Sequence, residues 1–391
     1  MKKLDHRLMI VFLIQVTEVL GFSLILPFLP FYAQAYGASP FIIGLLLTCF
    51  SLFQFITSPI MGKLSDSYGR RPLLIISQLS TTLSFIVLAF SNSLWLIFLS
   101  RSIDGILGSN FTIAQAYISD ITTQQDRSKA FGLSGAAFGI GFLIGPAIGG
   151  YLSQFNFVLP ALLAAGISAI SILLTYFFLP ETVTKINKKF SFKEVKILDP
   201  TPFKKYLFTK KTSSALWQFF FYSLAHVTWT ANFAVYGSMK LGLTAKITGY
   251  ILAYIGLISI VLRMKIIPKL IDLFTEEKLI FWGMISIIFG LLLAPLFNTL
   301  TPFFALMTFF SFGTGVTRPL LNGAISRKAP EDEQGAIMGV ANSLGSLSQI
   351  IGPILGGLLL TTSFPEGMLV AAAGIMLLGL AIFLKQPVQS H

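Results

Sequence analysis

Long apolar stretches separated by short polar segments make up almost the whole chain. A helix that crosses the hydrocarbon core of a bilayer needs about 20 mostly apolar residues. Runs of this length recur along the sequence, and each predicts one membrane-spanning helix. We place these spans near residues 8–31, 41–61, 73–91, 94–117, 131–152, 157–179, 213–236, 246–267, 278–297, 302–325, 335–360 and 367–384. The pattern therefore predicts an all-α polytopic membrane protein with twelve transmembrane helices.

A polar, lysine-rich segment interrupts this series after the sixth predicted span. Residues 181–212 are too polar to enter the bilayer, so we expect a cytoplasmic linker that carries a short surface helix. The linker separates a predicted N-terminal half, residues 1–180, from a predicted C-terminal half, residues 213–391. Each half contains six predicted spans.

Lysine and arginine residues gather in alternate loops between the predicted spans, with Lys240 and Lys246 as the exceptions. Cytoplasmic loops of membrane proteins are enriched in these residues, so the pattern places both termini in the cytoplasm and the protein in the cell membrane. Basic side chains near the cytoplasmic leaflet also meet anionic lipid headgroups. We therefore attribute the formal net charge of +12 to membrane topology and expect no nucleic acid partner.

Composition excludes several classes of protein. Hydrophobic residues make up 54% of the chain and charged residues only 11%, whereas soluble proteins carry about 25% charged residues. The single cysteine, Cys49, has no partner for an intrachain disulfide, and the histidines do not have metal-ligand spacing. The sequence contains neither a Gly-x-x-x-x-Gly-Lys-Ser/Thr loop nor a serine elbow. We therefore expect no enzyme activity, no cofactor, no metal and no ATP-driven transport.

The loop between the second and third predicted spans is the most informative segment. It runs from Gly62 to Pro72 and reads GKLSDSYGRRP. Glycine permits the positive φ that a tight turn needs, and Asp66 stands four residues before Arg70, with which it can pair. The complete loop closely resembles the signature between helices 2 and 3 of the major facilitator superfamily of transporters.

A second motif lies in the fourth predicted span. The run that begins at Arg101 and includes Gly105 and Gly108 resembles the superfamily's helix 4 motif, whose arginine is implicated in proton coupling. Asp104 replaces a polar residue of that motif. The resemblance therefore marks Arg101 as a candidate for coupling transport to protons.

A Gly-Pro-x-x-Gly-Gly pattern occurs in both predicted halves, over residues 145–150 and 352–357. Small residues let helices approach closely, and proline kinks a helix, so part of this pattern serves packing. The first copy also resembles the motif of the superfamily's antiporter branches. Family transporters have two six-helix halves related by a repeat, with the substrate site between them near the midplane. The residues of the antiporter motif are Gly141, Gly145, Pro146, Gly149 and Gly150.

Charged residues inside the predicted spans are candidates for function because they are costly in a bilayer. Glu18 lies near the middle of the first span, and Arg101 and Asp104 share one face of the fourth because they are three residues apart. We take Glu18 as the first candidate for the proton carrier and Asp104 as the second, with Arg101 adjusting proton affinity. Two alternatives remain open: a purely structural pair of Arg101 with Asp104, and a permanently protonated Glu18.

The seventh predicted span carries Tyr222, His226, Trp229 and Asn232 at spacings of three and four, which place them on one helix face. A polar and aromatic stripe is poorly suited to lipid, so we expect it to line a substrate cavity together with Gln15. A histidine of this kind can titrate near neutral pH, or it can simply be a satisfied hydrogen-bonding group.

The resemblance also implies a cytoplasmic charge cluster. In relatives of this family, an acid at the end of the fourth helix meets the loop between helices 2 and 3, and Asp120 has that position here. The resemblance implies a gating latch that holds the outward-open state. A weaker copy of the loop at residues 270–272 lacks the paired arginines, so we expect gating to be asymmetric. The predicted latch residues are Gly62, Asp66, Gly69, Arg70, Arg71 and Asp120.

These features together predict a secondary active transporter that resembles the twelve-helix drug:proton antiporters, which include tetracycline exporters. Its expected partners are protons, the lipid bilayer and a small amphipathic substrate, and the family expectation is a monomer. One alternative is a substrate-specific carrier for a metabolite, sugar or lipid. Another is a membrane sensor that transports nothing, which the cost of its intramembrane charges disfavours. No set of residues in the sequence identifies the substrate.

Overall fold

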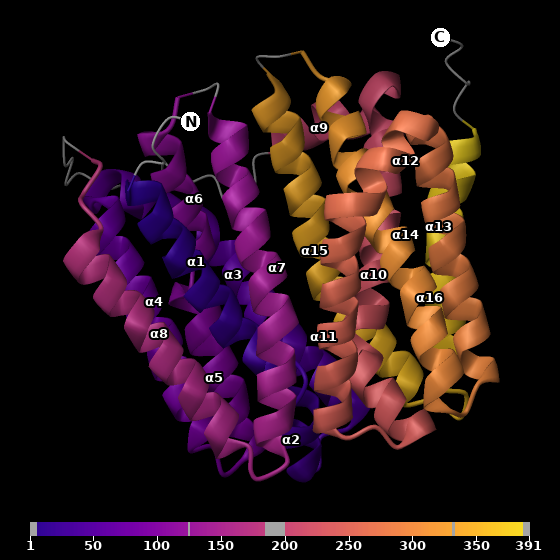
Figure 1. Ribbon diagram of the computed structural model, residues 1–391, viewed down its shortest axis with the longest axis horizontal. Coiled ribbons are helices and arrows are strands. Elements are labelled where there is room, and N and C mark those ends of the chain that lie inside the picture. The colour runs from indigo at the N-terminus through magenta and orange to yellow at the C-terminus, as the bar shows by residue number, and fades with distance from the viewer. Residues whose placement is uncertain (1–5, 124–125, 184–199, 331–332, 386–391) are drawn as a thin grey trace. The chain divides into compact units, whose positions relative to one another are not determined.

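The computed structural model describes residues 6–123, 126–183, 200–330 and 333–385 (Figure 1). All regular structure within these residues is helical, which confirms the predicted all-α class. The chain divides into two compact units. The first comprises Met1–Ala38, Cys49–Ile197 and Leu243–Gly256, and the second comprises Ser39–Thr48, Leu198–Gly242 and Leu257–His391.

The first unit contains the helices that carry most of the predicted site residues. Within it α1 packs against α7 and α8, and α4 packs against α5 and α8 (Figure 1). The third helix, α3, contributes residues to both units. The helices are α1 (His6–Ile25), α2 (Leu29–Ala35), α3 (Pro40–Tyr68), α4 (Arg70–Ala89), α5 (Leu94–Leu107), α6 (Asn110–Ile121), α7 (Arg127–Ser153) and α8 (Val158–Phe178).

The second unit contains the short helix expected in the linker, and residues 184–199 of that linker lie outside the described residues. Its main contacts join α10 to α15 and α16, and α13 to α14. A π-helical turn over Leu262–Ile266 separates α11 from α12. Its helices are α9 (Pro200–Phe208), α10 (Lys210–Leu241), α12 (Ile267–Leu273), α13 (Glu276–Leu293), α14 (Leu300–Arg327), α15 (Gln334–Leu360) and α16 (Gly367–Leu384). The helix α11 (Ala245–Val261) is shared, because its residues as far as Gly256 belong to the first unit.

Each predicted span falls on helix, but not all of these helices are equally suited to a bilayer. Among the described residues, nine helices are long and apolar enough to cross a membrane. The fourth predicted span is divided into α5 and α6, and α11 has only 17 residues. The third predicted span that is not among these nine helices falls on α10, whose polar and aromatic stripe lowers its hydropathy. The count of twelve spans, the cytoplasmic termini and the division into halves therefore stay predictions.

Glycines spaced by four along α7 bring this helix onto α1. A Cβ atom at Gly145 would overlap the Ser23 hydroxyl, and one at Gly149 would overlap the carbonyl oxygen of Leu24. The close approach also lets Ser23 Oγ donate a hydrogen bond of 2.8 Å to the carbonyl of Gly141. Small residues thus set the distance between two helices, as they commonly do in membranes.

The second copy of the glycine pattern packs in the same way within the second unit. A side chain at Gly352 would meet the backbone of α10 at Thr228, and one at Gly356 would overlap the amide of Asn232. The repeat seen in the sequence is therefore a repeated means of helix packing, in which α7 lies on α1 and α15 lies on α10.

Candidate functional site

The end of α3 and the start of α4 form a tight charged turn. Gly69 has φ of +108°, the conformation expected of a glycine in this loop. The following Arg70 is almost fully buried and forms ion pairs with Asp66 at 2.5 Å and with Asp120 at 2.9 Å. It also donates a hydrogen bond of 2.7 Å to Ser65 Oγ. The structure thus brings together Asp66, Arg70 and Asp120, three of the predicted latch residues.

Two residues just after α8 complete this cluster, and sequence analysis missed both. The carboxylate of Glu181 accepts hydrogen bonds from the backbone amides of Arg70 at 3.0 Å and Arg71 at 3.1 Å. An acid suits the start of a helix because the first amides there have no partner within the helix. Thr182 Oγ1 donates to Asp120 at 2.9 Å. The available signal was the position of Glu181 directly after a predicted span, on the same predicted side as the loop.

The two other predicted latch residues lie apart from these ion pairs. Arg71 donates a hydrogen bond to the carbonyl of Tyr176 in α8, and its guanidinium lies 5.4 Å from the centre of the Tyr176 ring. Gly62 faces α6, where a Cβ would come within 3.8 Å of Thr112. Arg71 therefore anchors α4 to α8, whereas a Cβ added at Gly62 would make only an ordinary van der Waals contact with α6.

Deeper in the first unit, Arg101 and Asp104 form a buried ion pair. Their closest nitrogen and oxygen atoms are 3.4 Å apart, and the two residues are 2% and 4% exposed. Arg101 also donates to Ser84 Oγ at 2.7 Å. The other oxygen of Asp104 accepts a hydrogen bond of 2.8 Å from Thr81 Oγ1. The pair is thus held by two hydroxyls of α4.

Glu18 joins this pair through a third helix. Asn110, the first residue of α6, donates to Glu18 Oε2 at 2.6 Å and to Thr81 Oγ1 at 3.0 Å. The hydroxyl of Ser171 in α8 lies close to the same carboxyl. A continuous polar chain therefore links Glu18 to Asp104 by way of Asn110 and Thr81.

The hydroxyl residues and the asparagine of this hydrogen-bonded network were not predicted from the sequence. Ser77, Thr81 and Ser84 recur at spacings of four and three along α4, so they form a polar stripe on one helix face. That stripe was a usable signal within an otherwise apolar span. Nothing in the sequence marked Asn110, because its role depends on the break between α5 and α6.

Gln15, predicted to contact substrate, lies outside the polar chain. Its side chain is 2% exposed and its oxygen accepts a hydrogen bond of 2.8 Å from Ser134 Oγ of α7. Gln15 therefore joins α1 to α7 in this structure, and its contact with a substrate stays a prediction.

In the second unit, the predicted stripe on α10 forms part of an aromatic core. His226 is stacked between the rings of Tyr222 and Phe310, at centroid distances of 6.0 and 5.8 Å. Trp229 is 1% exposed and packs against further rings of α10 and α14. Asn232 is fully buried and donates to the carbonyl of Pro353 at 3.3 Å. Of the four stripe residues, only His226 is partly exposed.

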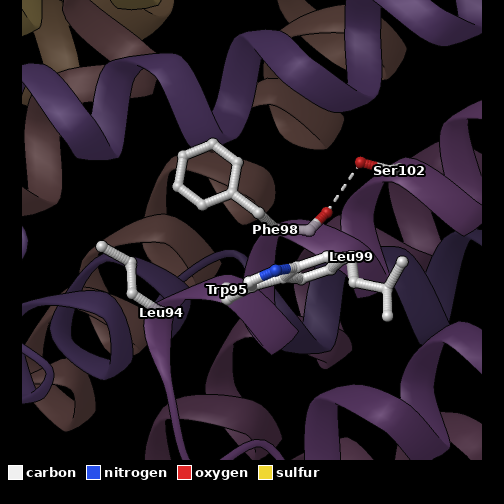
Figure 2. Close-up of a pocket in the computed structure, with 5 residues that line it drawn as sticks. All are labelled: Leu94, Trp95, Phe98, Leu99 and Ser102. Atoms are coloured by element: carbon white, nitrogen blue, oxygen red, sulfur yellow. Dashed lines mark hydrogen bonds between the residues drawn. The ribbon is translucent and has the colours of Figure 1, made fainter.

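A separate pocket of about 450 Å³ lies on the outer face of α5 (Figure 2). Figure 2 shows the ring of Trp95 beside Leu99, and the hydroxyl of Ser102 bonded to the carbonyl of Phe98 at 2.9 Å. Trp95 is 66% exposed. The lining residues carry no charge, so this pocket is chemically distinct from the buried ion pair. They are Leu94, Trp95, Phe98, Leu99 and Ser102.

Helices of membrane-spanning length that enclose a buried ion pair are typical of membrane transport proteins. Charged residues at such depth are costly and are retained where ions or substrates move. Known proteins give the particular family. The family model of the Major Facilitator Superfamily matches residues 11–353 and 265–391. The chain therefore belongs to the major facilitator superfamily and is a membrane transporter rather than an enzyme.

Individual relatives agree with this assignment. The chain is 30% identical over 356 residues to "Tetracycline resistance protein, class C" of Escherichia coli, an alignment that covers 90% of this chain and 89% of that protein. It is 28% identical over 398 residues to "Multidrug resistance protein 2" of Bacillus subtilis (strain 168), covering 98% and 96%. The structure of the human organic anion transporter MFSD10 shares the fold, with a TM-score of 0.73 and 21% identity over 96% of this chain and 98% of that one.

Proposed function

We propose that this protein exports drugs or other small amphipathic molecules in exchange for protons, by alternating access. Relatives named for tetracycline and multidrug resistance support a drug as substrate. The proposed location is the cell membrane, where export of a drug would protect the cell. The candidate proton-coupling and latch residues all belong to one chain, so we propose that a monomer is sufficient.

The observation that carries the proposal is the polar chain from Glu18 to Arg101 in the first unit. It contains two carboxyls and one guanidinium, so it has a net negative charge when both acids are ionised. A net charge is costly in a low-dielectric interior. Binding of one proton would neutralise the cluster. Release of that proton would restore its net negative charge, which attracts a cationic or polarised substrate. Such a cluster can couple the movement of a proton to the movement of a substrate.

The charge cluster around Arg70 supports a separate proposal about gating. Arg70 is bound to α3 through Asp66 and to the end of α6 through Asp120, while Glu181 caps α4. These contacts tie four segments together at the predicted cytoplasmic end of the first unit. We propose that they hold the outward-open state and do not touch substrate. For the substrate-contacting residues, His226 is the first to test because it is partly exposed.

Drug-driven proton flux tests the proposed function directly. Purified protein would be placed in liposomes that contain a pH-sensitive dye, and tetracycline or ethidium would be added along its gradient. We expect proton movement in the opposite direction, and its loss in Glu18→Gln with drug binding retained. Asp126→Asn, which neutralises an exposed acid before α7, is the matched control and should behave like the wild type.

Two results would contradict the proposal. If transport of a drug proceeds without proton movement, coupling to protons is wrong. If no drug binds or moves but a sugar, metabolite or lipid does, the protein is a substrate-specific carrier.

A further inference from the structure

The interruption between α5 and α6 places an amide between the two buried acids. Gly108 ends α5, and its amide donates to the carbonyl of Asp104 at 2.7 Å. A Cβ at Gly108 would meet the carboxylate of Asp104 at 2.5 Å, so a side chain there would displace that acid. Gln54 of α3 donates to the carbonyl of Gly108 at 3.3 Å, which satisfies part of the broken helix. The break thus depends on glycine and starts a new helix at Asn110.

The hydrogen bonds of this bridge have a definite direction. Asn110 donates to both Glu18 Oε2 and Thr81 Oγ1, so its amide nitrogen is fully used. Thr81 accepts this bond and donates a hydrogen bond of 2.8 Å to Asp104 Oδ1. The same hydroxyl also lies 3.3 Å from the carbonyl oxygen of Ser77, so the bond to Asp104 is the shorter of its two donor contacts. The bridge therefore supplies one donor to each carboxyl.

The two carboxyls nevertheless have unequal surroundings. Both oxygens of Asp104 face donors, namely Thr81 on one side and the Arg101 guanidinium on the other. Donors and a cation favour the ionised form of a carboxyl. Glu18 accepts a hydrogen bond from Asn110 on Oε2 and has the Ser171 hydroxyl nearby, whereas its Oε1 is buried without a hydrogen-bond partner. Oε1 is therefore the oxygen at which a proton can bind without displacing an existing bond.

The groups that act on Glu18 come from three other helices of the first unit. Asn110 belongs to α6 and Ser171 to α8, and Asp104 of α5 acts through its charge. Arg101 acts on Asp104, and the thiol of Cys49 lies near Arg101. This arrangement joins one cation and two acids through a single amide and a single hydroxyl.

The geometry points to Asn110 and Thr81 as positioning residues that assign the exchangeable proton to Glu18 Oε1 and keep Asp104 as the ionised partner of Arg101. The two acids then act as one unit that exchanges a single proton. This inference rests on the proposed proton-coupled function and refines it, because it separates the roles of the two candidate acids.

Infrared difference spectroscopy of the purified full-length protein can test the assignment, since a protonated carboxyl has its own carbonyl band. A titration without drug should show one band from a buried carboxyl, which Glu18→Gln removes and Asp104→Asn retains. In Thr81→Val, Asp104 loses one of its two donors and keeps Arg101, so we expect part of the band to become sensitive to Asp104→Asn. The midpoint of the titration should move by about one pH unit or more. Thr81→Ser should restore the wild-type spectrum.

Thr82→Val is the matched control, because Thr82 is the next residue of α4 and its hydroxyl bonds to Gln78 and Ser168 instead. If Thr81→Val proves unstable, Asn110→Ser interrupts the same bridge at its other bond and should redistribute the proton in the same way. The inference is overturned if Thr81→Val matches Thr82→Val, or if Asp104→Asn alone removes the band. Failure of the proposed function would look different: a drug would cause no proton release although the titration still shows the Glu18 band.

Discussion

The two units share a way of packing helices but differ in what they bury. In the first, Gly145 of α7 lies against Ser23 of α1, and in the second, Gly352 of α15 lies against Val227 and Thr228 of α10. Five residues before Ser23 stands Glu18, whereas five before Val227 stands Tyr222. The repeated scaffold therefore carries an acid in one unit and an aromatic ring in the other.

This difference separates two chemical tasks. Among the described residues of the second unit, each acid lies near a helix end. The interior of its α10 and α14 is filled with stacked rings instead. Rings bind apolar and cationic molecules, whereas buried carboxyls bind protons. We infer that proton exchange belongs to the first unit, which variants in each unit can test. The described acids of the second unit are Asp272, Glu276, Glu277, Glu333 and Glu366.

The largest expected effect comes from removing the cation of the first unit. Arg101→Met leaves the carboxylate of Asp104 buried without its partner, which typically costs about 3–5 kcal/mol. We expect a large loss of thermal stability and no measurable transport. The double variant Arg101→Met with Asp104→Leu should recover most of the stability, because no uncompensated charge remains, but not the transport.

This pair of variants decides between a structural and a coupling role for the ion pair. Thermal unfolding and drug-driven proton flux would be measured for the wild type, both single variants and the double variant. Recovery of transport together with stability in the double variant would show that the ion pair is purely structural.

Alanine substitutions should show that glycine packing is equivalent in the two units. Gly149→Ala places a Cβ against the backbone of α1, and Gly356→Ala, at the equivalent position of the repeat, places one against Asn232 and the backbone of α10. Overpacking of this kind typically costs about 1–3 kcal/mol, so both variants should unfold at lower temperature. Gly135→Ala and Gly339→Ala are matched controls because nothing lies within 4 Å of either added Cβ.

The controls should leave stability unchanged or raise it slightly, since alanine favours helix over glycine by about 1 kcal/mol. A lowered unfolding temperature in only one unit would mean that the sequence repeat does not reflect equivalent packing.

A smaller effect is expected at the charge cluster around Arg70. Asp120→Asn removes one of its two acids but leaves Asp66, Ser65 and the Glu181 cap. Because the ion pair between Arg70 and Asp120 is partly exposed to solvent, we expect little change in stability. The turnover of drug export should fall several-fold while drug affinity stays within about twofold, since one state of the transport cycle is less populated.

Glu276→Gln is the matched control in the second unit, where Glu276 pairs with Arg327 on exposed surface. Its turnover should stay near that of the wild type. Loss of drug binding in Asp120→Asn would contradict a gating role, and an equal fall in turnover for Glu276→Gln would remove the asymmetry between the units.

Sequence alone was sufficient for the helical class and for the identity of the charged loop. Spans are long and apolar, and the loop motif has both glycine and ion-pairing residues at fixed spacing, so both signals are local. The ion pair between Arg101 and Asp104 was also predictable because the residues are three apart on one helix. These predictions concern residues that are close together in the sequence, and their spacing alone indicates which of them lie on one helix face or in one turn.

The remaining contacts join residues far apart in the chain. Glu181 reaches the start of α4 across 111 residues, and Asn110 reaches Glu18 across 92. No local periodicity or spacing identifies which residues meet over such separations. The stripe on α10 shows a different limit: its spacing places Trp229 and Asn232 on one face, but spacing does not say whether that face meets a cavity or another helix. Here they pack against α14 and α15.

The smallest expected effect concerns the linker helix of the second unit. Glu333, just before α15, accepts hydrogen bonds from Lys205 Nζ at 2.5 Å and Tyr206 OH at 2.8 Å, which hold α9 in place. The bond from Lys205, then that from Tyr206, lowers the pKa of the Glu333 carboxyl. A carboxyl with a lowered pKa stabilises the docked state above its ordinary pKa, and this contribution is lost as pH falls through the lowered value. Lowering the pH should therefore weaken the docking of α9 on the start of α15.

Hydrogen exchange of the α9 amides, corrected for the intrinsic effect of pH, measures this docking. At neutral pH, Glu333→Gln should raise exchange by a few-fold, because the neutral amide accepts more weakly than a carboxylate. Lys205→Met should have a smaller effect, since Tyr206 is 4% exposed and still donates to Glu333. The wild type should approach the behaviour of Glu333→Gln only below pH of about 4. Equal exchange in all three proteins would show that packing of Tyr206, and not the carboxylate, holds α9 in place, in which case the linker helix would not respond to acid.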